Sequence, residues 1–229
     1  MRAQAVLFDK DGTLLDFQRT WGPWSLHVVD ILSGGDAALA GEMDRAWGLD
    51  RERQQILPGS VVVAGTVQQV AGALLELCDD LTLNQMIAFL DETGAQATPV
   101  PVLPLIPFLD GIEELGLVAG IATNDSEAVA RAQLRVLDVE HRFDFIAGYD
   151  SGFGGKPAPD MCLAFSDYMG VSPADVVMVG DSSHDLEAGR AAGMQTAAVL
   201  TGVAEVGELA ALADIVLNDI SELADWLTE

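Results

Sequence analysis

AVLFDKDGT (residues 5–13) joins four apolar residues to two aspartates that lie two positions apart. The apolar residues Ala5–Phe8 have the pattern of a strand that is buried on both faces of a parallel sheet. Asp9 and Asp11 therefore follow a strand end, which is where open α/β sheets bind ligands. Two carboxylates this close repel each other, and a cation between them or a proton on one of them would relieve the repulsion. Asp-Gly is also a common turn pair, so the stretch alone leaves a turn and a site both open.

Further apolar runs of the same kind recur along the chain, with helical patterns between them. The runs cover residues 117–122, 143–147, 176–179 and 196–200, with a further candidate at 215–217. The helical patterns cover residues 127–137, 159–169 and 183–192. Strands that alternate with helices predict βαβ units. We therefore expect an α/β fold with a Rossmann-like parallel sheet at the centre of a three-layer α/β/α core.

The alternation is interrupted between residues 19 and 98. Helical patterns fill this stretch, for example at residues 67–77 and 83–92, while the run Val61–Val63 is ambiguous. These patterns predict an α-helical cap that is inserted after the first strand.

A connector with four prolines, residues 98–107, follows the helical stretch and is expected to contain no helix, because proline stiffens the chain and lacks an N–H donor. We therefore assign residues 1–18 and 99–229 to the α/β core and residues 19–98 to the cap.

The composition excludes several classes of partner. A formal net charge of −25 and a pI near 4.1 argue against nucleic acid and anionic membrane surfaces, which both require a positive face. Cys78 and Cys162 fit neither a disulfide framework nor a zinc site and are expected to be buried thiols. The sequence shows no signal peptide and no apolar stretch that could span a bilayer. We expect a soluble cytoplasmic protein, and a monomer and a homodimer both stay open.

Polar side chains follow the ends of four expected strands. They are Asp9 and Asp11 after the first, Thr123 and Asn124 after the second, Lys156 after the third, and Asp181 and Asp185 after the fourth. The carboxyl ends of parallel strands meet at one edge, so we expect these side chains to converge. Hard oxygen ligands without a thiolate or histidine cluster favour Mg²⁺. An aspartate that attacks phosphorus, a second one that moves protons, and donors for the phosphate oxygens together predict phosphoryl transfer.

The same residues resemble the motifs of the haloacid dehalogenase superfamily of hydrolases. The stretch from Asp9 to Leu14 is similar to the first motif, Thr123 to the second, Lys156 to the third, and Gly180-Asp181 with Asp185 to the fourth. The likeness covers roughly residues 4–16 and 105–200. A helical cap directly after the first motif resembles the branch of phosphoglycolate phosphatase and β-phosphoglucomutase. Residues 108–120 are short for the helix and turn that usually precede the second motif, so we expect a clipped helix there.

The resemblance implies a role for each motif residue. It makes Asp9 the nucleophile and a Mg²⁺ ligand, Asp11 the acid and base and a ligand through its backbone carbonyl, Thr123 and Lys156 the holders of the phosphoryl group, and Asp181 and Asp185 further Mg²⁺ ligands. Asn124 and Ser182 would support them. Simpler roles stand beside these, since Thr123 and Asn124 could cap a helix and Asp185 could be a favourable acid in a first helical turn. We expect Lys10 to point away from the aspartates as a structural residue.

A Mg²⁺-dependent phosphatase for a small organic phosphate monoester is the predicted function, and the resemblance implies 2-phosphoglycolate as the first candidate substrate. Asp11 argues against a dehalogenase, whose halide leaving group needs no proton, and a cap without lysine argues against phosphonate cleavage. A β-phosphoglucomutase-like sugar phosphomutase is the alternative, although it needs basic cap residues for a second phosphate. Arg19 is our candidate for a cap residue that contacts substrate. A non-enzymatic, phospho-accepting receiver module is less favoured, because its accepting aspartate follows a middle strand.

Overall fold

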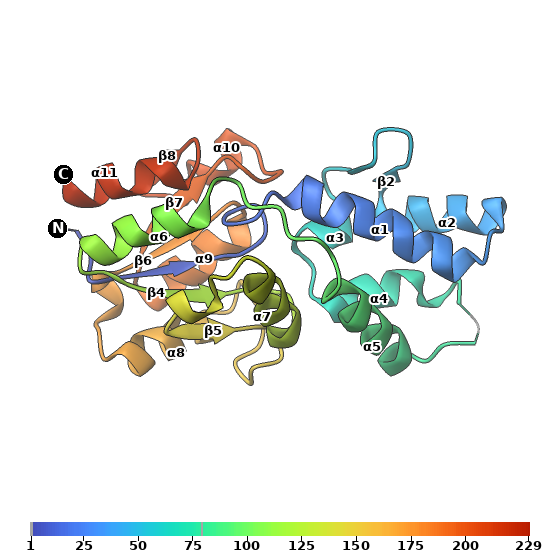
Figure 1. The fold of residues 1–229 in the computed structure, drawn as a ribbon, viewed down its shortest axis with the longest axis horizontal. Helices are drawn as coiled ribbons and strands as arrows, with labels where there is room; N and C mark the ends of the chain where they lie inside the picture. Colours follow the sequence, from blue (N-terminus) through green and yellow to red (C-terminus); the bar gives the residue numbers. More distant parts are fainter. Residues whose placement is uncertain (1, 79) are drawn as a thin grey trace.

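Six parallel strands form a central sheet in residues 2–78 and 80–229, the part of the chain that the computed structural model describes (Figure 1). The strands are β1 (Ala5–Phe8), β4 (Val118–Ala122), β5 (Phe145–Ala147), β6 (Val176–Gly180), β7 (Gln195–Val199) and β8 (Ile215–Leu217). Their order in the sheet is β5-β4-β1-β6-β7-β8. Every one of these strands covers an apolar run that the sequence marks as a strand.

Helices cover both faces of the sheet. The side chains of Val6 and Phe8 pack with those of α6 (Leu105–Glu114), α7 (Glu127–Val136) and α11 (Leu223–Thr228). The side chains of Ala5 and Leu7 point to the other face and pack with those of α8 (Asp160–Met169) and α9 (Ser183–Ala192). Successive residues of a strand point to opposite faces, so one apolar run serves two cores. The predicted three-layer α/β/α fold is confirmed.

The register of the sheet aligns the carboxyl ends of the three central strands β4, β1 and β6. Phe8 pairs with Ile121 of β4 on one side and with Val179 of β6 on the other. All four side chains of β1 are fully buried, and burying one large apolar side chain stabilises a fold by roughly 1.5–3 kcal/mol. The polar residues that follow β1, β4 and β6 therefore reach the same edge of the sheet.

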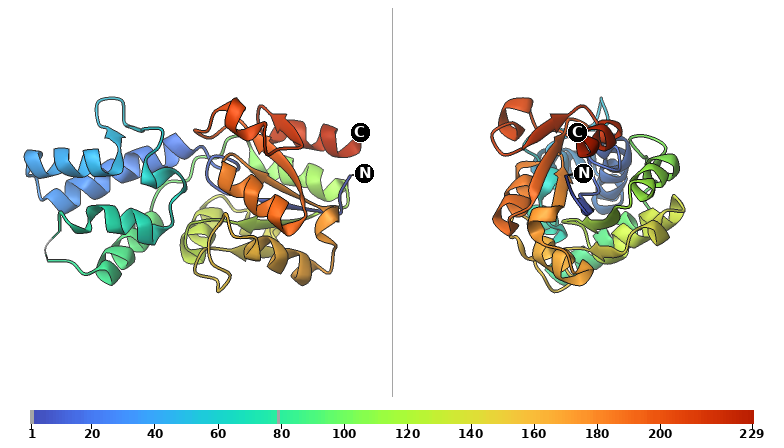
Figure 2. Two further views of the ribbon diagram at one scale, coloured as in Figure 1. Left: turned by 180° about the vertical axis from the view of Figure 1, so that it is seen from behind. Right: turned by 90° about the vertical axis from the view of Figure 1, so that its left-hand side faces the viewer.

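A group of helices lies beyond this edge, at the other end of the molecule (Figures 1 and 2). It contains α1 (Phe17–Ser33), α2 (Ala37–Trp47), α3 (Val61–Ala64), α4 (Val67–Leu75), α5 (Leu83–Gly94) and the antiparallel pair β2 (Leu49–Asp50) and β3 (Gln55–Ile56). These helices share an apolar cluster of their own, in which Met43, Trp47, Leu74 and Met86 are fully buried. The assignment of residues 19–98 to a separate cap domain stays a prediction.

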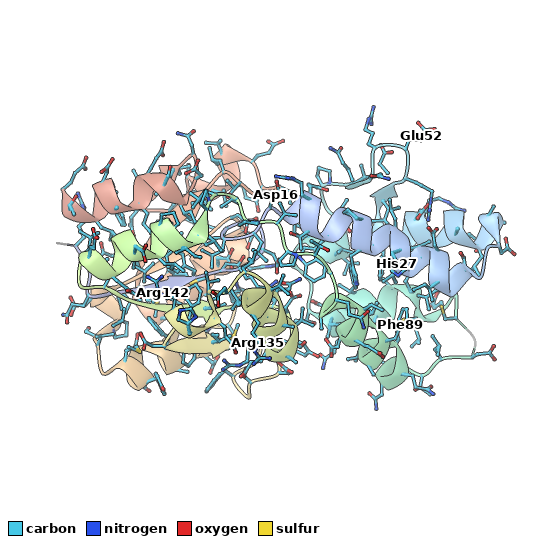
Figure 3. The ribbon with its side chains drawn as sticks, viewed as in Figure 1. Asp16, His27, Glu52, Phe89, Arg135 and Arg142 are labelled. Atoms are coloured by element: carbon cyan, nitrogen blue, oxygen red, sulfur yellow. The ribbon has the colours of Figure 1, made fainter. Side chains whose placement is uncertain are left out.

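Two segments connect the helical group with the sheet, and they run side by side. Asp16 begins α1 and lies at this junction (Figure 3), where its carboxylate accepts a hydrogen bond from Arg19 N at 3.0 Å. Asp16 N donates to Val100 O at 2.7 Å, and Val102 N donates to Leu14 O at 3.0 Å. The outgoing and the returning segment are therefore held together by backbone hydrogen bonds.

Three local features differ from the sequence-based expectations. The ambiguous run Val61–Val63 lies in the helix α3, and the β2–β3 pair was not predicted. The expectation that residues 98–107 contain no helix is wrong at their end, since α6 begins at Leu105 and contains Pro107. A proline is tolerated in a first helical turn, where its missing N–H has no partner within the helix. The helix before β4 thus gains part of its first turn from the connector.

The remaining short elements complete the core. They are α10 (Val206–Leu209) and the 3₁₀ turns η1 (Glu140–Arg142), η2 (Pro173–Asp175) and η3 (Ile220–Glu222). Within residues 2–78 and 80–229, no helix combines the length and apolar character that crossing a membrane requires.

Candidate active site

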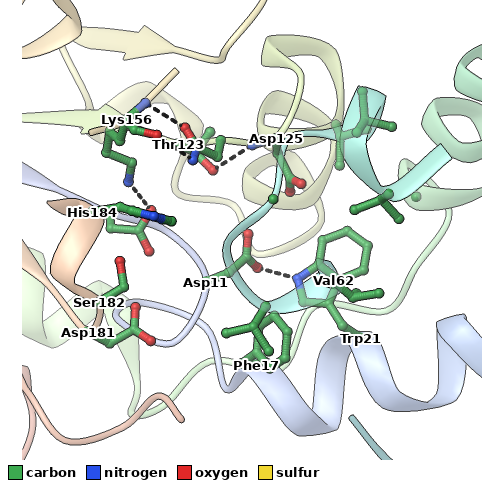
Figure 4. A pocket seen from close by; sticks show the side chains of 18 of the residues that line it. Asp11, Phe17, Trp21, Val62, Thr123, Asp125, Lys156, Asp181, Ser182 and His184 are labelled. Carbon is green, nitrogen blue, oxygen red and sulfur yellow. Dashed lines mark hydrogen bonds and ion pairs between the residues drawn. The ribbon is translucent and has the colours of Figure 1, made fainter. Parts of the chain in front are cut away.

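A pocket lies between the carboxyl edge of the sheet and the helices α1, α4 and α5 (Figure 4). The sheet side supplies every candidate residue that follows a strand in the sequence: Asp9, Asp11, Thr123, Asn124, Lys156, Asp181 and Asp185. They come from segments that lie up to about 176 positions apart, and the parallel sheet brings them together.

Lys156 lies among the candidate residues on the sheet side of the pocket. Its ammonium nitrogen is 2.6 Å from Asp9 Oδ1 and 2.5 Å from Asp185 Oδ1, and it also donates to Ala122 O at 2.7 Å. Burial alone would lower the pKa of this ammonium group, but the Asp185 and Asp9 carboxylates outweigh burial and raise it. Lys156 is therefore a protonated, fixed cation.

Asn124 fixes the backbone of Lys156. The amide oxygen of Asn124 accepts a hydrogen bond from Lys156 N at 2.8 Å, and its amide nitrogen donates to Lys156 O at 3.1 Å. This pair of bonds ties the loop after β5 to the end of β4. Asn124 thus acts on the site through the lysine that it holds.

Three buried carboxylates form a cluster around this cation. One oxygen from each of Asp9, Asp181 and Asp185 lies within 4.8 Å of the others. Burial raises the pKa of Asp9 to about 7, against the attraction of Lys156, and Asp185 and Asp11 raise it further. Burial, Asp9 and Asp185 raise the pKa of Asp181 well above its usual range. Three hard oxygen donors that share one lysine make a set that a divalent cation such as Mg²⁺ would neutralise.

Backbone packs tightly against Asp181. Gly12 has a φ of +85°, and a Cβ atom at this position would lie 2.3 Å from Asp181 Oδ2. A Cβ atom on Gly202, in the loop after β7, would lie 1.7 Å from the same oxygen. Thr13 Oγ1 donates to Asp181 Oδ1 at 3.4 Å. The glycine of the Asp-Gly pair therefore makes room for a carboxylate as well as a turn, and Gly202 is a site residue that no sequence pattern indicated.

Asp11 is held by different partners from those of Asp9. Trp21 Nε1 donates to Asp11 Oδ1 at 2.6 Å (Figure 4), and Lys10 Nζ lies 2.5 Å from Asp11 Oδ2. The fully buried ammonium group of Lys10 also lies 2.8 Å from Asp125 Oδ2. The expectation that Lys10 points away from the pair was wrong. Each of the two lysines of the chain instead pairs with two aspartates, Lys10 with Asp11 and Asp125 and Lys156 with Asp9 and Asp185.

The charges around Lys10 perturb each other. Burial would lower the pKa of Lys10, but Asp11 and Asp125 raise it above its ordinary value. Burial raises the pKa of Asp125 to about 7 against the attraction of Lys10, and the Asp11 carboxylate raises it further. Sequence reasoning missed Asp125 and the hydrogen bond of Trp21 to Asp11, because a contact across the fold leaves no spacing pattern in the chain.

The simpler capping roles coexist with these contacts. Ser182 N and Ser182 Oγ donate to Asp185 Oδ2 at 3.0 and 2.7 Å, which forms a capping box at the start of α9. Asp185 uses its other oxygen for Lys156. Thr123 Oγ1 accepts a hydrogen bond from Asp125 N at 3.1 Å, so its own hydroxyl proton can point to a ligand.

The helical group supplies an apolar wall opposite the cluster. Phe17, Trp21 and Trp24 lie on one face of α1, at positions i, i+4 and i+7. Arg19 is exposed and lines a separate hollow together with His27. Two residues correspond to about 200° around a helix, so Arg19 faces away from the side of Phe17. The structure thus does not bring Arg19 together with the other candidate residues.

Comparison with known proteins agrees with this geometry. A family model described as haloacid dehalogenase-like hydrolase matches residues 3–193. Phosphoglycolate phosphatase of Xylella fastidiosa (strain 9a5c) is 34% identical over 204 residues, which cover 87% of this chain and 81% of that protein. N-acetylmuramic acid 6-phosphate phosphatase of Pseudomonas aeruginosa is 28% identical over 99% of this chain and 96% of that protein.

A solved structure shows the same fold. It is a Haemophilus somnus protein, described as a predicted phosphoglycolate phosphatase, with a TM-score of 0.76 and 16% identity over 100% of this chain and 99% of that one. The match of the family model to most of the chain confirms the family that the four motifs resemble. The chain therefore belongs to the haloacid dehalogenase-like hydrolases, and it is an enzyme of the phosphatase class.

Proposed function

We propose that this enzyme is a Mg²⁺-dependent phosphatase that hydrolyses a small organic phosphate monoester through an aspartyl-phosphate on Asp9. One observation carries the proposal: Lys156 Nζ lies between Asp9 and Asp185, at 2.6 and 2.5 Å, inside a buried cluster with Asp181. The lysine gives a nucleophilic carboxylate and a phosphoryl group a common counter-charge.

In the first step, a carboxylate oxygen of Asp9 attacks the phosphorus atom and the bond between phosphorus and the ester oxygen breaks. The alcohol leaves with a proton from Asp11. Lys156 and the Thr123 hydroxyl hold the non-bridging phosphoryl oxygens as charge builds up on them. The products of this step are a free alcohol and an acyl phosphate on Asp9.

In the second step, Asp11 accepts a proton from water and the water oxygen attacks the same phosphorus atom. The bond between phosphorus and the Asp9 oxygen breaks, and inorganic phosphate leaves. The sum is one ester and one water converted to one alcohol and one phosphate, with both aspartates restored.

The acidic cluster fits a resident Mg²⁺ ion. Asp9, Asp181 and Asp185 would hold it through their side chains, and Asp11 would do so through its backbone carbonyl. When bound, the ion supplies positive charge next to the transferred phosphoryl group. Burial first, and then the neighbouring carboxylates, raise the pKa of Asp9 and of Asp181, and a bound cation would offset both effects, which supports the assignment.

The named relatives make 2-phosphoglycolate the first substrate to test. A sugar phosphomutase is less favoured, since none of the described cap residues that line the pocket is a lysine or arginine that could hold a second phosphate. A small-molecule phosphate ester as partner, a cytoplasmic location and a monomeric or homodimeric state remain predictions. A receiver module would keep its phosphoryl group and release no phosphate steadily.

Phosphate release from a panel of phosphorylated metabolites tests the proposal. We expect steady release in Mg²⁺, loss in EDTA, and a fall of at least about 10³-fold in kcat for Asp9→Asn. Asp160→Asn is the matched control, because it removes an exposed carboxylate that does not line the pocket. Activity of Asp9→Asn near that of Asp160→Asn would overturn the nucleophile, and full activity in EDTA would overturn the metal requirement.

A further inference from the structure

The cap side of the pocket has a chemistry of its own. Three aromatic side chains of α1 line it: Phe17, Trp21 and Trp24. Aliphatic side chains of α3, α4 and α5 complete the wall, namely Val62, Val63, Val67, Val70 and Leu90. Asp91 of α5 is the one charged residue that the cap contributes among the described residues that line the pocket. The alcohol part of a substrate would therefore meet aromatic and aliphatic side chains and one carboxylate.

Asp91 is held in place by the core. Its Oδ1 accepts a hydrogen bond from Ser126 Oγ at 2.9 Å, and Ser126 is the residue that caps the start of α7. Among the described residues, no ion pair includes Asp91, although the chain pairs other acids of the cap with arginine. Its carboxylate thus lies at the pocket wall with a hydroxyl as partner and no neighbouring cation to neutralise it.

The basic residues of the cap that the structure describes either form ion pairs or lie outside the lining of this pocket. Arg51 pairs with Asp30 and Asp44, and Arg53 pairs with Asp50. Arg19 and His27 line a separate hollow on the other side of Trp24. A second anionic group on a substrate would therefore find no counter-charge at the cap wall, and it would be repelled by Asp91 in a partly desolvated space.

We propose that the enzyme selects phosphate monoesters whose alcohol part carries no negative charge, and that Asp91 with the aromatic wall favours a positively charged nitrogen on that part. The inference rests on the proposed phosphatase function and adds the substrate class. Aromatic faces attract ammonium groups through their quadrupoles, and a nearby carboxylate adds direct attraction. Asp91, Trp21 and Trp24 are then specificity-determining residues on the leaving-group side, while Lys156 serves the phosphoryl side.

Three phosphate esters that differ in the charge of the alcohol part test the proposal. The alcohol part is cationic in phosphocholine, neutral in its carbon isostere 3,3-dimethylbutyl phosphate, and anionic in 2-phosphoglycolate. We expect kcat/KM in the wild-type enzyme to fall in that order. A higher kcat/KM for 2-phosphoglycolate than for the neutral ester would overturn the selection against negative charge.

The variant Asp91→Asn isolates the carboxylate, because an asparagine oxygen can still accept the bond from Ser126. We expect kcat/KM to fall on the order of tenfold for phosphocholine, to rise several-fold for 2-phosphoglycolate, and to stay within about twofold for 3,3-dimethylbutyl phosphate. Each ratio compares one ester between two proteins, so differences in leaving-group chemistry cancel. Equal changes for all three esters would show a merely structural Asp91 and overturn its role in selection.

Asp150→Asn is the matched control. Asp150 is close enough to raise the pKa of Asp91, but it lies outside the lining of this pocket. We expect it to leave the order of the three esters unchanged, whereas a shift as large as that of Asp91→Asn would make general electrostatics the cause and overturn the proposal. If none of the three esters releases phosphate while another ester of the metabolite panel does so in a manner that Asp9→Asn abolishes, the phosphatase proposal stands and this inference fails. If no ester of the panel does so, the phosphatase proposal fails and the inference fails with it.

Discussion

Trp21 Nε1 lies 2.6 Å from Asp11 Oδ1, and this hydrogen bond joins the first helix of the cap to an aspartate of the first core motif. Asp11 is the residue that we propose as acid and base. The helical group therefore contributes more than a wall to the pocket, since one of its side chains holds the carboxylate to which we assign the proton transfer. Lys10 occupies the other oxygen of the same group.

Replacing Trp21 by phenylalanine removes the N–H donor and keeps an aromatic ring beside Trp24, with which Trp21 packs edge to face. A hydrogen bond to a charged group contributes about 1.5–3 kcal/mol, so we expect kcat for alkyl phosphates to fall by about tenfold or more. The loss should be smaller for p-nitrophenyl phosphate, whose leaving group needs little protonation. Steady-state kinetics with both substrates measures this difference, and equal losses would contradict a role of Trp21 through Asp11.

Lys10→Met should destabilise the fold strongly. The substitution leaves Asp11 and Asp125 without the buried cation that both contact, and breaking a buried ion pair typically costs about 3–5 kcal/mol. Urea denaturation measures the change in the free energy of unfolding. Arg53→Met is the control, because its exposed pair with Asp50 is screened by solvent and contributes little to stability. Equal changes in the free energy of unfolding for the two variants would contradict the stabilising role that we assign to Lys10.

Gly202→Ala should weaken Mg²⁺ binding, although it changes none of the residues that we propose to bind the ion. The added Cβ would lie 1.7 Å from Asp181 Oδ2, so either the carboxylate or the loop after β7 must move. We expect at least about a tenfold loss of Mg²⁺ affinity, measured by calorimetry and by the rise in melting temperature that Mg²⁺ produces. Gly207→Ala adds the same methyl group where no atom lies within 4 Å, and it should leave Mg²⁺ affinity unchanged. Unaltered affinity in Gly202→Ala would speak against Asp181 as a ligand.

The metal-free protein should lose stability as the pH rises from about 4 to about 7. Burial raises the folded-state pKa of Asp9 and of Asp125 from 3.8 to about 7, so the folded chain binds more protons than the unfolded chain in this interval. The free energy of unfolding then falls with rising pH until both groups are ionised. Asp125→Asn removes one of them and should make the fall shallower by an amount on the order of 1–3 kcal/mol. Urea denaturation in EDTA between about pH 4 and pH 7 measures this pH dependence. A free energy of unfolding that rises with pH would contradict the prediction.

The sheet could be predicted from the sequence because its strands are buried on both faces. Such strands leave unbroken apolar runs, and the runs at β1, β4 and β6 end in polar residues within one or two positions of the observed ends. The motif residues could be predicted for a related reason, since a parallel sheet brings the residues after its strands to one edge. The positions of the motifs along the chain were therefore enough to predict that these candidate residues lie together, while their roles stay predictions.

Features that depend on contacts between distant segments could not be predicted. Lys10 meets Asp125 across 115 positions, and Gly202 meets Asp181 through a loop with no pattern of its own. The β2–β3 pair has two residues in each strand, too few for an alternation to appear. Arg19 was predicted to contact substrate because of its charge. The pocket is lined by the face of α1 that carries Phe17 and Trp21, and Arg19 lies on another face.

The backbone bonds between Asp16 and Val100 and between Leu14 and Val102 give the core a simple boundary. The chain leaves the sheet domain near Asp16 and returns to it near Val100, at neighbouring positions. The helical group between them is therefore attached to the sheet in the same way as a short loop. The covalent attachment of a replacement module has to match only two neighbouring backbone positions, while its side chains have to supply the contacts that Trp21 and Asp91 make with the core. The reacting groups and the selectivity of such an enzyme can then diverge separately in evolution, and a transplanted cap is a practical route to redirect it.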